Sequence, residues 1–486
     1  MKKNKFFVAV LCMILFTVLL TWILPVNYFS GELVKDARSQ VGLFDLLGYP
    51  SIALSYFGNN LMYLLIIGGF YGVLYKIGAY RSLLDKLADK TKGHEKLVLI
   101  LIISVISVLV AVTGATLGIW MIIPFIISLV LLMGFDKITA ALVSIGSIAM
   151  GTIGNLFSST YITDGYNLSS QNGAGILNSL LNVSSDIKKT VSTLLIPKII
   201  VLILGVALLV FLTLRHISKS LEKETDIDEF IPKAVSKKEA KSSLPLIVIL
   251  DVVLLVSLLA FVSWSSVFNT DAFTKATEAV LTKFKIFKFP ILGKILGKVN
   301  PFEQWSIVEM SSLLLMASAL IGVIYKVKFK EFFENFFNGV KKALKPAVLV
   351  VLAYVVLVIV SYNPITLTII KPIITLTKSF NVFTMSISAL ISSIFNVDIY
   401  YIATNNLQYI LSVVTNTKAY SLIGMIWYSM YGFASLVSPT SVILVAVLSY
   451  LDIPYKKWIK SNWLLLLATL CMLLVVFTIC MLVMKL

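Results

Sequence analysis

The sequence predicts an all-α polytopic membrane protein with about nine transmembrane helices and two re-entrant hairpins in two inverted repeats. Hydrophobic residues make up 58% of the 486-residue chain and charged residues 13%, a composition typical of proteins that cross a bilayer many times. Two stretches of 39 residues, 97–135 and 379–417, contain one charged residue between them, Asp398. Each stretch is about twice the ~20 residues that span a bilayer, which indicates two apolar arms joined by a turn.

Each long apolar stretch is interrupted near its middle, and an interrupted helix follows each of them. A hairpin followed by a broken helix, present twice, indicates a secondary transporter built from two structural repeats. Hydropathy does not separate a re-entrant hairpin from two joined full spans, but the nearly uncharged turns favour re-entrance. The interruptions are VTGATLG at 112–118, GTIGNLFSS at 151–159, SSIFNVD at 392–398 and SLVSPTS at 435–441.

Three regions follow one another along the chain. The first repeat is expected at 1–215, a charged linker with span 5 and an amphipathic loop at 216–304, and the second repeat at 305–486. Because the single span 5 lies between the repeats, the second repeat enters the membrane from the opposite side. Spans are expected at about 6–25, 60–79, 138–165, 193–215, 243–268, 305–326, 346–364, 421–449 and 462–484, and the two hairpins at 97–133 and 380–416.

The distribution of Lys and Arg predicts the orientation. With the N-terminus in the cytoplasm, the expected cytoplasmic segments carry 25 of these residues and the external segments 14, in agreement with the positive-inside rule. Topology and anionic lipid headgroups then explain the net charge of +17 without nucleic acid. Residues 269–304 carry six lysines on the expected outside, and we interpret them as an amphipathic interfacial segment. We expect a multi-pass protein of a bacterial cytoplasmic membrane, with an uncleaved first span.

The interruptions of the helices predict the binding site. Helix N-termini there can attract a carboxylate, and freed carbonyls and hydroxyls can bind Na⁺. Close helix packing is the alternative role for Gly, Ser and Thr in membranes. Candidate Na⁺ ligands are Asn155, Ser158 and Thr440, because neutral oxygens suit a hard cation. The candidate substrate- or ion-binding residues are Thr113, Gly114, Thr116, Gly154, Asn155, Ser158, Ser159, Asn396, Asp398, Ser438, Pro439, Thr440 and Ser441.

Asp398 is the one carboxylate in the long apolar stretches. An ionisable residue within the membrane is a functional candidate by default. It could carry a coupling proton, bind Na⁺ or face a cationic substrate. The alternative is a hairpin tip that reaches external water.

Several motifs resemble those of one transporter family. They are TWILP near the end of the first span, GGFYGVLYKIGA at 68–79, GFDKITA at 134–140, and GFASLVSPTSVILVAVLSYLDIPYKKWIK at 432–460. The chain resembles the YfcC-type branch of the anaerobic four-carbon dicarboxylate carrier (DcuC) family, within the ion transporter superfamily. The resemblance implies nine spans and two hairpins, with substrate between hairpin tips and broken helices, often in a dimer. It also implies carriers of carboxylates and, in some branches, arginine/ornithine exchangers.

The chain departs from the family pattern at three places. The turn at 113–118 is neutral where an acidic, glycine-rich turn is common. Asn155 is followed by Leu156 and Phe157 instead of forming NPF, and FNVDIYY replaces a Ser/Gly-rich turn in the second hairpin. These departures leave the substrate open, so the resemblance does not carry the dicarboxylate over.

We therefore expect a secondary active transporter, by ion-coupled symport or exchange, of a small amino acid or carboxylate. The alternative is an arginine/ornithine-type or other basic amino acid antiporter, and beyond that a channel or a non-transporting membrane scaffold. The chain contains no GxxxxGK[ST], HExxH or GxSxG motif, so neither an ATP-driven pump nor an enzyme is expected. No cofactor is expected beyond a coupling Na⁺ or H⁺. Expected partners are the substrate, membrane lipids and a second copy of the chain.

Overall fold

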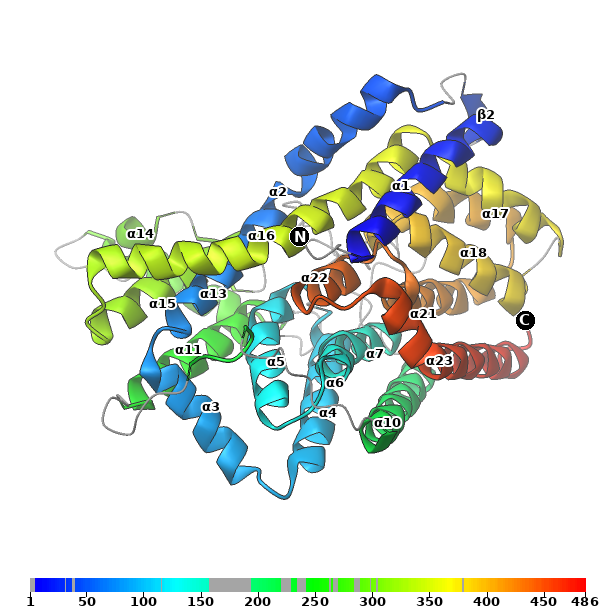
Figure 1. Ribbon diagram of the computed structural model, residues 1–486. Helices are drawn as coiled ribbons and strands as arrows, with labels where there is room; N and C mark the ends of the chain where they lie inside the picture. The colour runs from blue at the N-terminus through cyan, green and yellow to red at the C-terminus, as the bar shows by residue number, and fades with distance from the viewer. Residues whose placement is uncertain are drawn as a thin grey trace.

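The computed structural model is built almost entirely of α-helices (Figure 1), and the prediction of an all-α polytopic membrane protein is confirmed. A short antiparallel hairpin of β1 (Val26–Ser30) and β2 (Glu32–Asp36) follows the first helix. The structure describes residues 5–30, 32–36, 40–114, 116–156, 194–219, 229–233, 242–261, 264, 270–283, 289–297, 299–302, 305–377 and 380–486.

In the described residues, eight segments are long and apolar enough to cross a membrane. Seven of them fall on expected spans, and the eighth, α4, is the first arm of the first expected hairpin. The eight are α1 (Lys5–Ile23), α2 (Leu43–Leu74), α4 (Glu95–Thr113), α10 (Leu195–Lys219), α15 (Ile307–Ile324), α16 (Phe329–Tyr362), α21 (Tyr420–Val437) with α22 (Val442–Tyr450), and α23 (Tyr455–Val483).

Shorter helices complete the membrane part. The expected span 3 begins with a helix that includes a π-helical turn, and the expected span 5 is α11 (Leu244–Phe261). The first hairpin consists of α4, the 3₁₀ segment η1 (Gly118–Ile122) and α5 (Ile123–Leu132). Span 3 consists of α6 (Lys137–Ala141), η2 (Leu142–Gly146) and α7 (Ser147–Ile153). The second hairpin consists of α18 (Val382–Phe395), α19 (Ile399–Ile402), η3 (Ala403–Leu407) and α20 (Gln408–Val413).

Two central helices are longer than expected, and this corrects the boundaries of spans 2 and 7. α2 begins at Leu43 instead of about residue 60, because the Asp45 carboxylate accepts a hydrogen bond from Gly42 N at 2.9 Å and caps the helix. α16 begins at Phe329 instead of about residue 346. It continues through Pro346, since one lost hydrogen bond does not end a helix that packs along its whole length.

Two helices outside the expected spans were missed. α3 (Gly78–Lys90) follows α2, and α17 (Ile365–Thr375) follows α16. Within the lysine-rich segment expected to lie at the interface, the structure describes α13 (Ala272–Thr282) and α14 (Ile291–Leu296).

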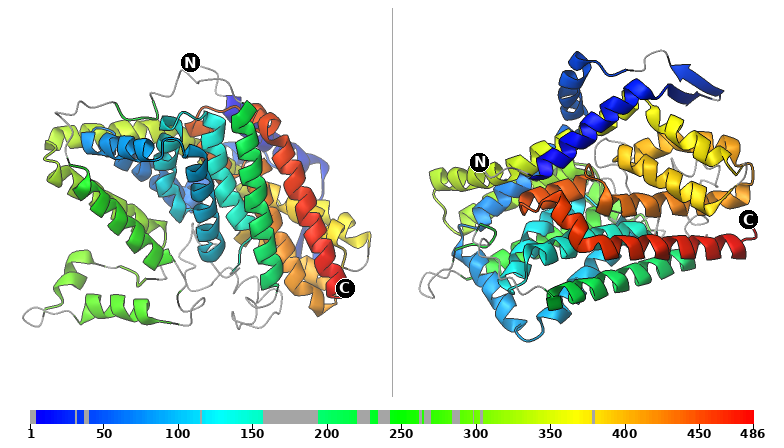
Figure 2. Two further views of the ribbon diagram at one scale, coloured as in Figure 1. Left: turned by 90° about the horizontal axis from the view of Figure 1, so that it is seen from below. Right: turned by 45° about the vertical axis from the view of Figure 1, so that its right-hand side comes forward.

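The described parts of the two halves have the same order of elements. α2 and α16 are 32 and 34 residues long, and the following α3 and α17 are 13 and 11 residues long. A hairpin, an interrupted helix and a last long helix then follow in each half. The last helices, α10 and α23, lie side by side (Figure 2). This is the order expected of two repeats, whose bounds at 1–215 and 305–486 stay predictions.

The two halves meet along α2 and α16. A Cβ atom on Gly72 would lie 2.7 Å from the Gly339 Cα, and one on Gly68 would lie 2.7 Å from the Gly339 carbonyl oxygen. Glycine at these three positions therefore lets the two backbones touch, as in GxxxG contacts between membrane helices. Further along the pair, Asn60 Nδ2 donates to the Tyr354 hydroxyl at 2.7 Å.

Candidate substrate-binding site

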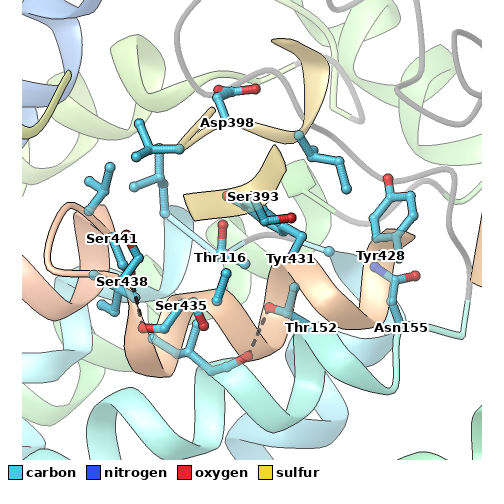
Figure 3. A pocket seen from close by; sticks show the side chains of 18 of the residues that line it. Thr116, Thr152, Asn155, Ser393, Asp398, Tyr428, Tyr431, Ser435, Ser438 and Ser441 are labelled. Atoms are coloured by element: carbon cyan, nitrogen blue, oxygen red, sulfur yellow. Dashed lines mark hydrogen bonds between the residues drawn. The ribbon is translucent and has the colours of Figure 1, made fainter. Parts of the chain in front are cut away.

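A cavity of about 90 Å³ lies where the interrupted helices and hairpin turns of both halves meet. Hydroxyl groups dominate its polar lining, with one amide and one carboxylate (Figure 3). Of the residues expected to bind substrate or ion, six line it: Gly114, Thr116, Asn155, Asp398, Ser438 and Ser441.

The turn of the first hairpin is formed by a helix that ends on glycine. Gly114 has φ +69°, the left-handed conformation that favours glycine, and its N–H donates to Val110 O at 2.7 Å. Thr116 follows in the turn and lines the cavity. Thr113 is buried, and its hydroxyl donates to Leu109 O at 2.6 Å. The structure therefore places Thr113 in the helix end and not in the cavity lining.

The first interrupted helix, α7, ends beside the cavity at Ile153. Leu156 N donates to Ala111 O at 2.9 Å, which ties the interruption to the end of α4. Asn155 lines the cavity with 5% of its surface exposed, and its Oδ1 has no hydrogen-bond partner among the described residues. A buried amide oxygen without a partner costs free energy. A ligand that donates a hydrogen bond to this oxygen would offset that cost.

Gly154 has a packing role. A Cβ there would lie 2.6 Å from the Leu202 Cβ of α10, so glycine permits close contact between the interruption and α10. Ser158 and Ser159 lie outside the described residues.

The second interrupted helix is tied to the second hairpin by hydroxyl groups. Ser438 Oγ and Thr440 Oγ1 donate to Ile394 O near the end of α18, at 3.4 and 3.3 Å. Ser441 Oγ donates to Ser435 O at 3.0 Å. Pro439 has no N–H to donate, so the helix stops between α21 and α22. Thr440 is fully buried and, like Pro439, is not among the cavity residues.

The turn of the second hairpin has one structural residue and one cavity residue. Asn396 is fully buried, donates to Ser392 O at 3.1 Å and accepts from Asn405 Nδ2 at 3.1 Å. It therefore shapes the turn. Asp398, two residues later, is partly exposed and lines the cavity.

The electrostatic character of the cavity is set by Asp398. Among the described residues that line the cavity, none is Lys, Arg or His. The N-terminus of α22 also faces it, through Ser441, Val442 and Ile443. A helix N-terminus has partial positive charge. The cavity therefore has a carboxylate from one hairpin turn and, on another wall, hydroxyls beside a helix N-terminus.

Several cavity residues were not expected from the sequence. Tyr428, Tyr431 and Ser435 lie three and four residues apart along α21, so they share one face of the helix. Their helical spacing is the sequence signal of this polar face, and the interruptions alone do not reveal it. The other unexpected residues with polar groups are Trp120, Thr152, Tyr354 and Ser393.

The three candidate Na⁺ ligands are not assembled in the described structure. Asn155 lines the cavity, Thr440 does not, and Ser158 lies outside the described residues. Na⁺ binding therefore stays a proposal.

Comparison with known proteins decides the family. A family model described as the C4-dicarboxylate anaerobic carrier, DcuC, matches residues 34–483. This chain belongs to the C4-dicarboxylate anaerobic carrier family. The resemblance expected from the sequence is thus confirmed, and the protein is a membrane carrier and not an enzyme.

One solved structure is similar over almost the whole length of both chains. It is the YdaH transporter of Alcanivorax borkumensis, with 14% sequence identity, a TM-score of 0.42, and 98% and 97% of the two chains covered. No curated protein sequence matches the chain significantly.

Proposed function

We propose that this carrier moves a small amino acid across a bacterial cytoplasmic membrane by ion-coupled symport or by exchange. The observation that carries the proposal is the charge of the cavity. Its described lining holds the Asp398 carboxylate and no basic side chain. An ammonium group on the substrate would be attracted to Asp398.

The carboxylate of an amino acid fits a different wall of the cavity. This carboxylate would lie near the N-terminus of α22, at Val442 and Ile443, where the first backbone N–H groups of the helix have no partner within the helix and can donate to it. Asn155 Oδ1, which has no partner among the described residues, is an acceptor for a substrate N–H or a ligand for a coupling Na⁺.

A four-carbon dicarboxylate fits this cavity less well. Two negative charges would enter a confined site beside a third carboxylate, and like charges close together in a low dielectric repel strongly. The family name favours a carboxylate substrate, so a dicarboxylate is the rival outcome. A basic amino acid antiporter is the nearer alternative, because Asp398 would serve an arginine-like cation as well.

Orientation, assembly and coupling belong to the same proposal. The N-terminus lies in the cytoplasm, Na⁺ or H⁺ is the coupling ion where transport is symport, and a homodimer is the assembly. The positive-inside pattern of Lys and Arg supports the orientation. No other cofactor is proposed.

Ligand-induced thermal stabilisation of the purified carrier tests the substrate class, because a ligand that binds only the folded state raises Tm. We expect amino acids to raise Tm and four-carbon dicarboxylates to leave it unchanged, with and without Na⁺. Counterflow into proteoliposomes then tests transport, since preloaded substrate accelerates uptake by an exchanger and not by a channel. Stabilisation by a dicarboxylate alone would overturn the proposed substrate, and no ligand response of any kind would favour a scaffold.

A further inference from the structure

A second cavity of about 120 Å³ lies beside the substrate cavity, between α2, α5, α16 and α22. α22 lies between α16 and α5 in the centre of the molecule (Figure 1). The lining of the second cavity is mainly apolar and aromatic and includes two exposed lysines, Lys76 and Lys342. Trp120 lines both cavities.

Three elements pass from the first cavity to the second in the same direction. On α22, Val442 lines the first cavity and Ala446, one turn later, lines the second. On α16, Tyr354 lines the first, and Pro346 lines the second. On the first hairpin, Thr116 precedes Trp120 in the first cavity and Pro124 follows it in the second. The second cavity therefore continues the first toward the side where α22 ends and α16 begins.

Two tyrosines of α2 hold the backbone around Trp120. The Tyr63 hydroxyl donates to Gly118 O at 3.2 Å, and the Tyr71 hydroxyl donates to Met121 O at 2.7 Å. The Trp120 side chain is 3% exposed, and its indole N–H has no hydrogen-bond partner among the described residues. The backbone at this point is thus fixed, while no described hydrogen bond holds the indole, which lies between the two cavities.

We propose that Trp120 is the gate between the substrate cavity and a passage formed by the second cavity. The passage opens on the side of Lys76 and Lys342. The positive-inside pattern makes this the cytoplasmic side. The proposal rests on the proposed function only in taking the first cavity as the substrate site.

The two lysines give the mouth of the passage a positive charge. Lys342 Nζ donates to Glu229 O at 2.9 Å and lies 5.6 Å from the centre of the Tyr75 ring. The lysine is thus held at the passage while it stays exposed to water. A positive mouth raises the local concentration of anions and would guide the carboxylate end of a substrate toward Trp120.

Labelling of single cysteines tests the gate. In a chain whose three native cysteines are replaced, Ala446→Cys marks the passage and Ser435→Cys marks the substrate cavity. An anionic methanethiosulfonate, applied to inside-out membrane vesicles, should label Ala446→Cys about tenfold faster than Ser435→Cys. The labelling rate of a site behind a gate is proportional to the fraction of time that the gate is open. In right-side-out vesicles, Ala446→Cys should be labelled slowly.

Trp120→Ala should then raise the labelling rate of Ser435→Cys about tenfold and leave that of Ala446→Cys within about twofold. Trp120→Phe, which keeps an aromatic ring, should change neither rate. Tyr71→Phe removes the anchor on Met121 O and should raise Ser435→Cys labelling severalfold, which keeps the test valid if Trp120→Ala does not fold. Unchanged Ser435→Cys labelling in the folded variants would overturn the gate. Because labelling needs no substrate, this result is independent of the proposed function.

A second measurement tests the charged mouth. Replacing Lys76 and Lys342 by Gln should lower the ratio of anionic to cationic reagent rates at Ala446→Cys about tenfold at low salt. Lys330→Gln is the control, since Lys330 is an exposed lysine of α16, the helix of Lys342, and does not line the passage. The passage does not open at these lysines if Lys330→Gln lowers the ratio of rates equally. The same conclusion follows if replacing both Lys76 and Lys342 leaves the ratio unchanged.

Discussion

At the scale of single residues, Asp398 determines the charge of the cavity that lies between the two halves. It stands in the turn between α18 and α19, and the lining around it is composed of hydroxyl, amide, aromatic and aliphatic groups. A carboxylate in such surroundings favours a ligand that carries positive charge. The ammonium group of the proposed substrate and a proposed coupling ion both carry such a charge.

Asp398→Asn is expected to abolish or uncouple transport, and Asp398→Glu to retain part of it. Loss of a charged hydrogen bond would cost about 1.5–3 kcal/mol, or at least tenfold in affinity. Uptake measured against pH in wild type and Asp398→Asn checks the role. A pH dependence that only the wild type shows would identify Asp398 as the titrating group. Asp271→Asn is the control, since Asp271 is an exposed carboxylate paired with Lys275. Silent changes at Asp398 would mean that it faces only water.

Asn155 and Asn396 should respond differently to alanine, although both are buried asparagines at interruptions. Asn155 Oδ1 has no described partner, so Asn155→Ala should weaken substrate affinity about tenfold and leave Tm nearly unchanged. Asn396 makes two hydrogen bonds within its turn, so Asn396→Ala should lower the free energy of unfolding by about 1–3 kcal/mol. Ligand titration and thermal unfolding of both variants measure the two effects. The opposite pattern would remove Asn155 from the site.

The sequence predicts where the helices break but not which residue in each interruption faces the cavity. Ser438 and Ser441 line it and Thr440 does not, although all three have hydroxyl groups in one short segment. Helical periodicity ends at the interruption, so the direction of each side chain depends on tertiary contacts such as those of Ser438 and Thr440 with Ile394. The polar face of α21 was predictable, because regular helical spacing places Tyr428, Tyr431 and Ser435 together.

At the scale of elements, the contact of α2 with α16 depends on small residues. If Gly339 were replaced by a larger residue, its Cβ would collide with backbone atoms of Gly68 and Gly72. Hydropathy indicated both helices, but their lengths depend on this packing. The first half of α16 is polar enough to look like a loop, and Asp45 caps α2 well before its apolar run. The sequence therefore gives apolar cores more reliably than helix ends.

Gly339→Val should disrupt the protein by forcing α2 and α16 apart. Overpacking in a rigid core costs about 1–3 kcal/mol or more, and here the obstacle is backbone that cannot move aside. We expect lower expression and a lower Tm. Gly48→Ala is the matched control in α2, because no atom lies within 4 Å of the added methyl, and the better helix propensity of Ala should leave Tm equal or higher. Similar Tm values for the two variants would show that the helices are not in close contact.

A second element contact depends on pH. Asp136 caps α6, because its Oδ1 accepts a hydrogen bond from Thr139 N at 2.8 Å. The Asp136 Oδ2 lies 2.9 Å from His216 Nε2 on α10. Burial raises the pKa of Asp136, but the hydrogen bonds from His216 and Thr139 outweigh this and lower it to about 2. A lowered pKa stabilises the fold above the unfolded pKa, and the stabilisation is lost as pH falls toward the folded pKa.

Asp136→Asn should therefore lower Tm at pH 7. The difference from wild type should shrink as pH falls from about 5 to 3, since the advantage of the charged form is lost between the ordinary Asp pKa and about 2. Thermal unfolding of both proteins across this range checks it. Asp85→Asn is the control, because Asp85 forms only a partly exposed pair with Arg81. A difference that stays constant with pH would assign the effect of Asp136→Asn to packing alone.

At the scale of the whole molecule, both halves supply the walls of one cavity. Gly114 and Asn155 come from the first half, and Asp398 and Ser441 from the second. Ser429 of α21 donates to Ile153 O, the last residue of α7, at 2.8 Å. The end of α7 thus contacts the middle of α21. A relative movement of the halves would change the cavity from both sides, which is the requirement for alternating access.

The inverted relation of the halves predicts the sidedness of their corresponding helices. α3 and α17 occupy the same place in the two element orders, so inverted repeats should place them on opposite sides of the membrane. With the native cysteines replaced, Asp89→Cys on α3 should react with an impermeant maleimide only in inside-out vesicles, and Thr375→Cys on α17 only in right-side-out vesicles. Both side chains are exposed, so packing against other helices does not shield either of them from the reagent. Reaction of both from one side would show that the halves are parallel, and the positive charge of 80–96 would then need another explanation than cytoplasmic location.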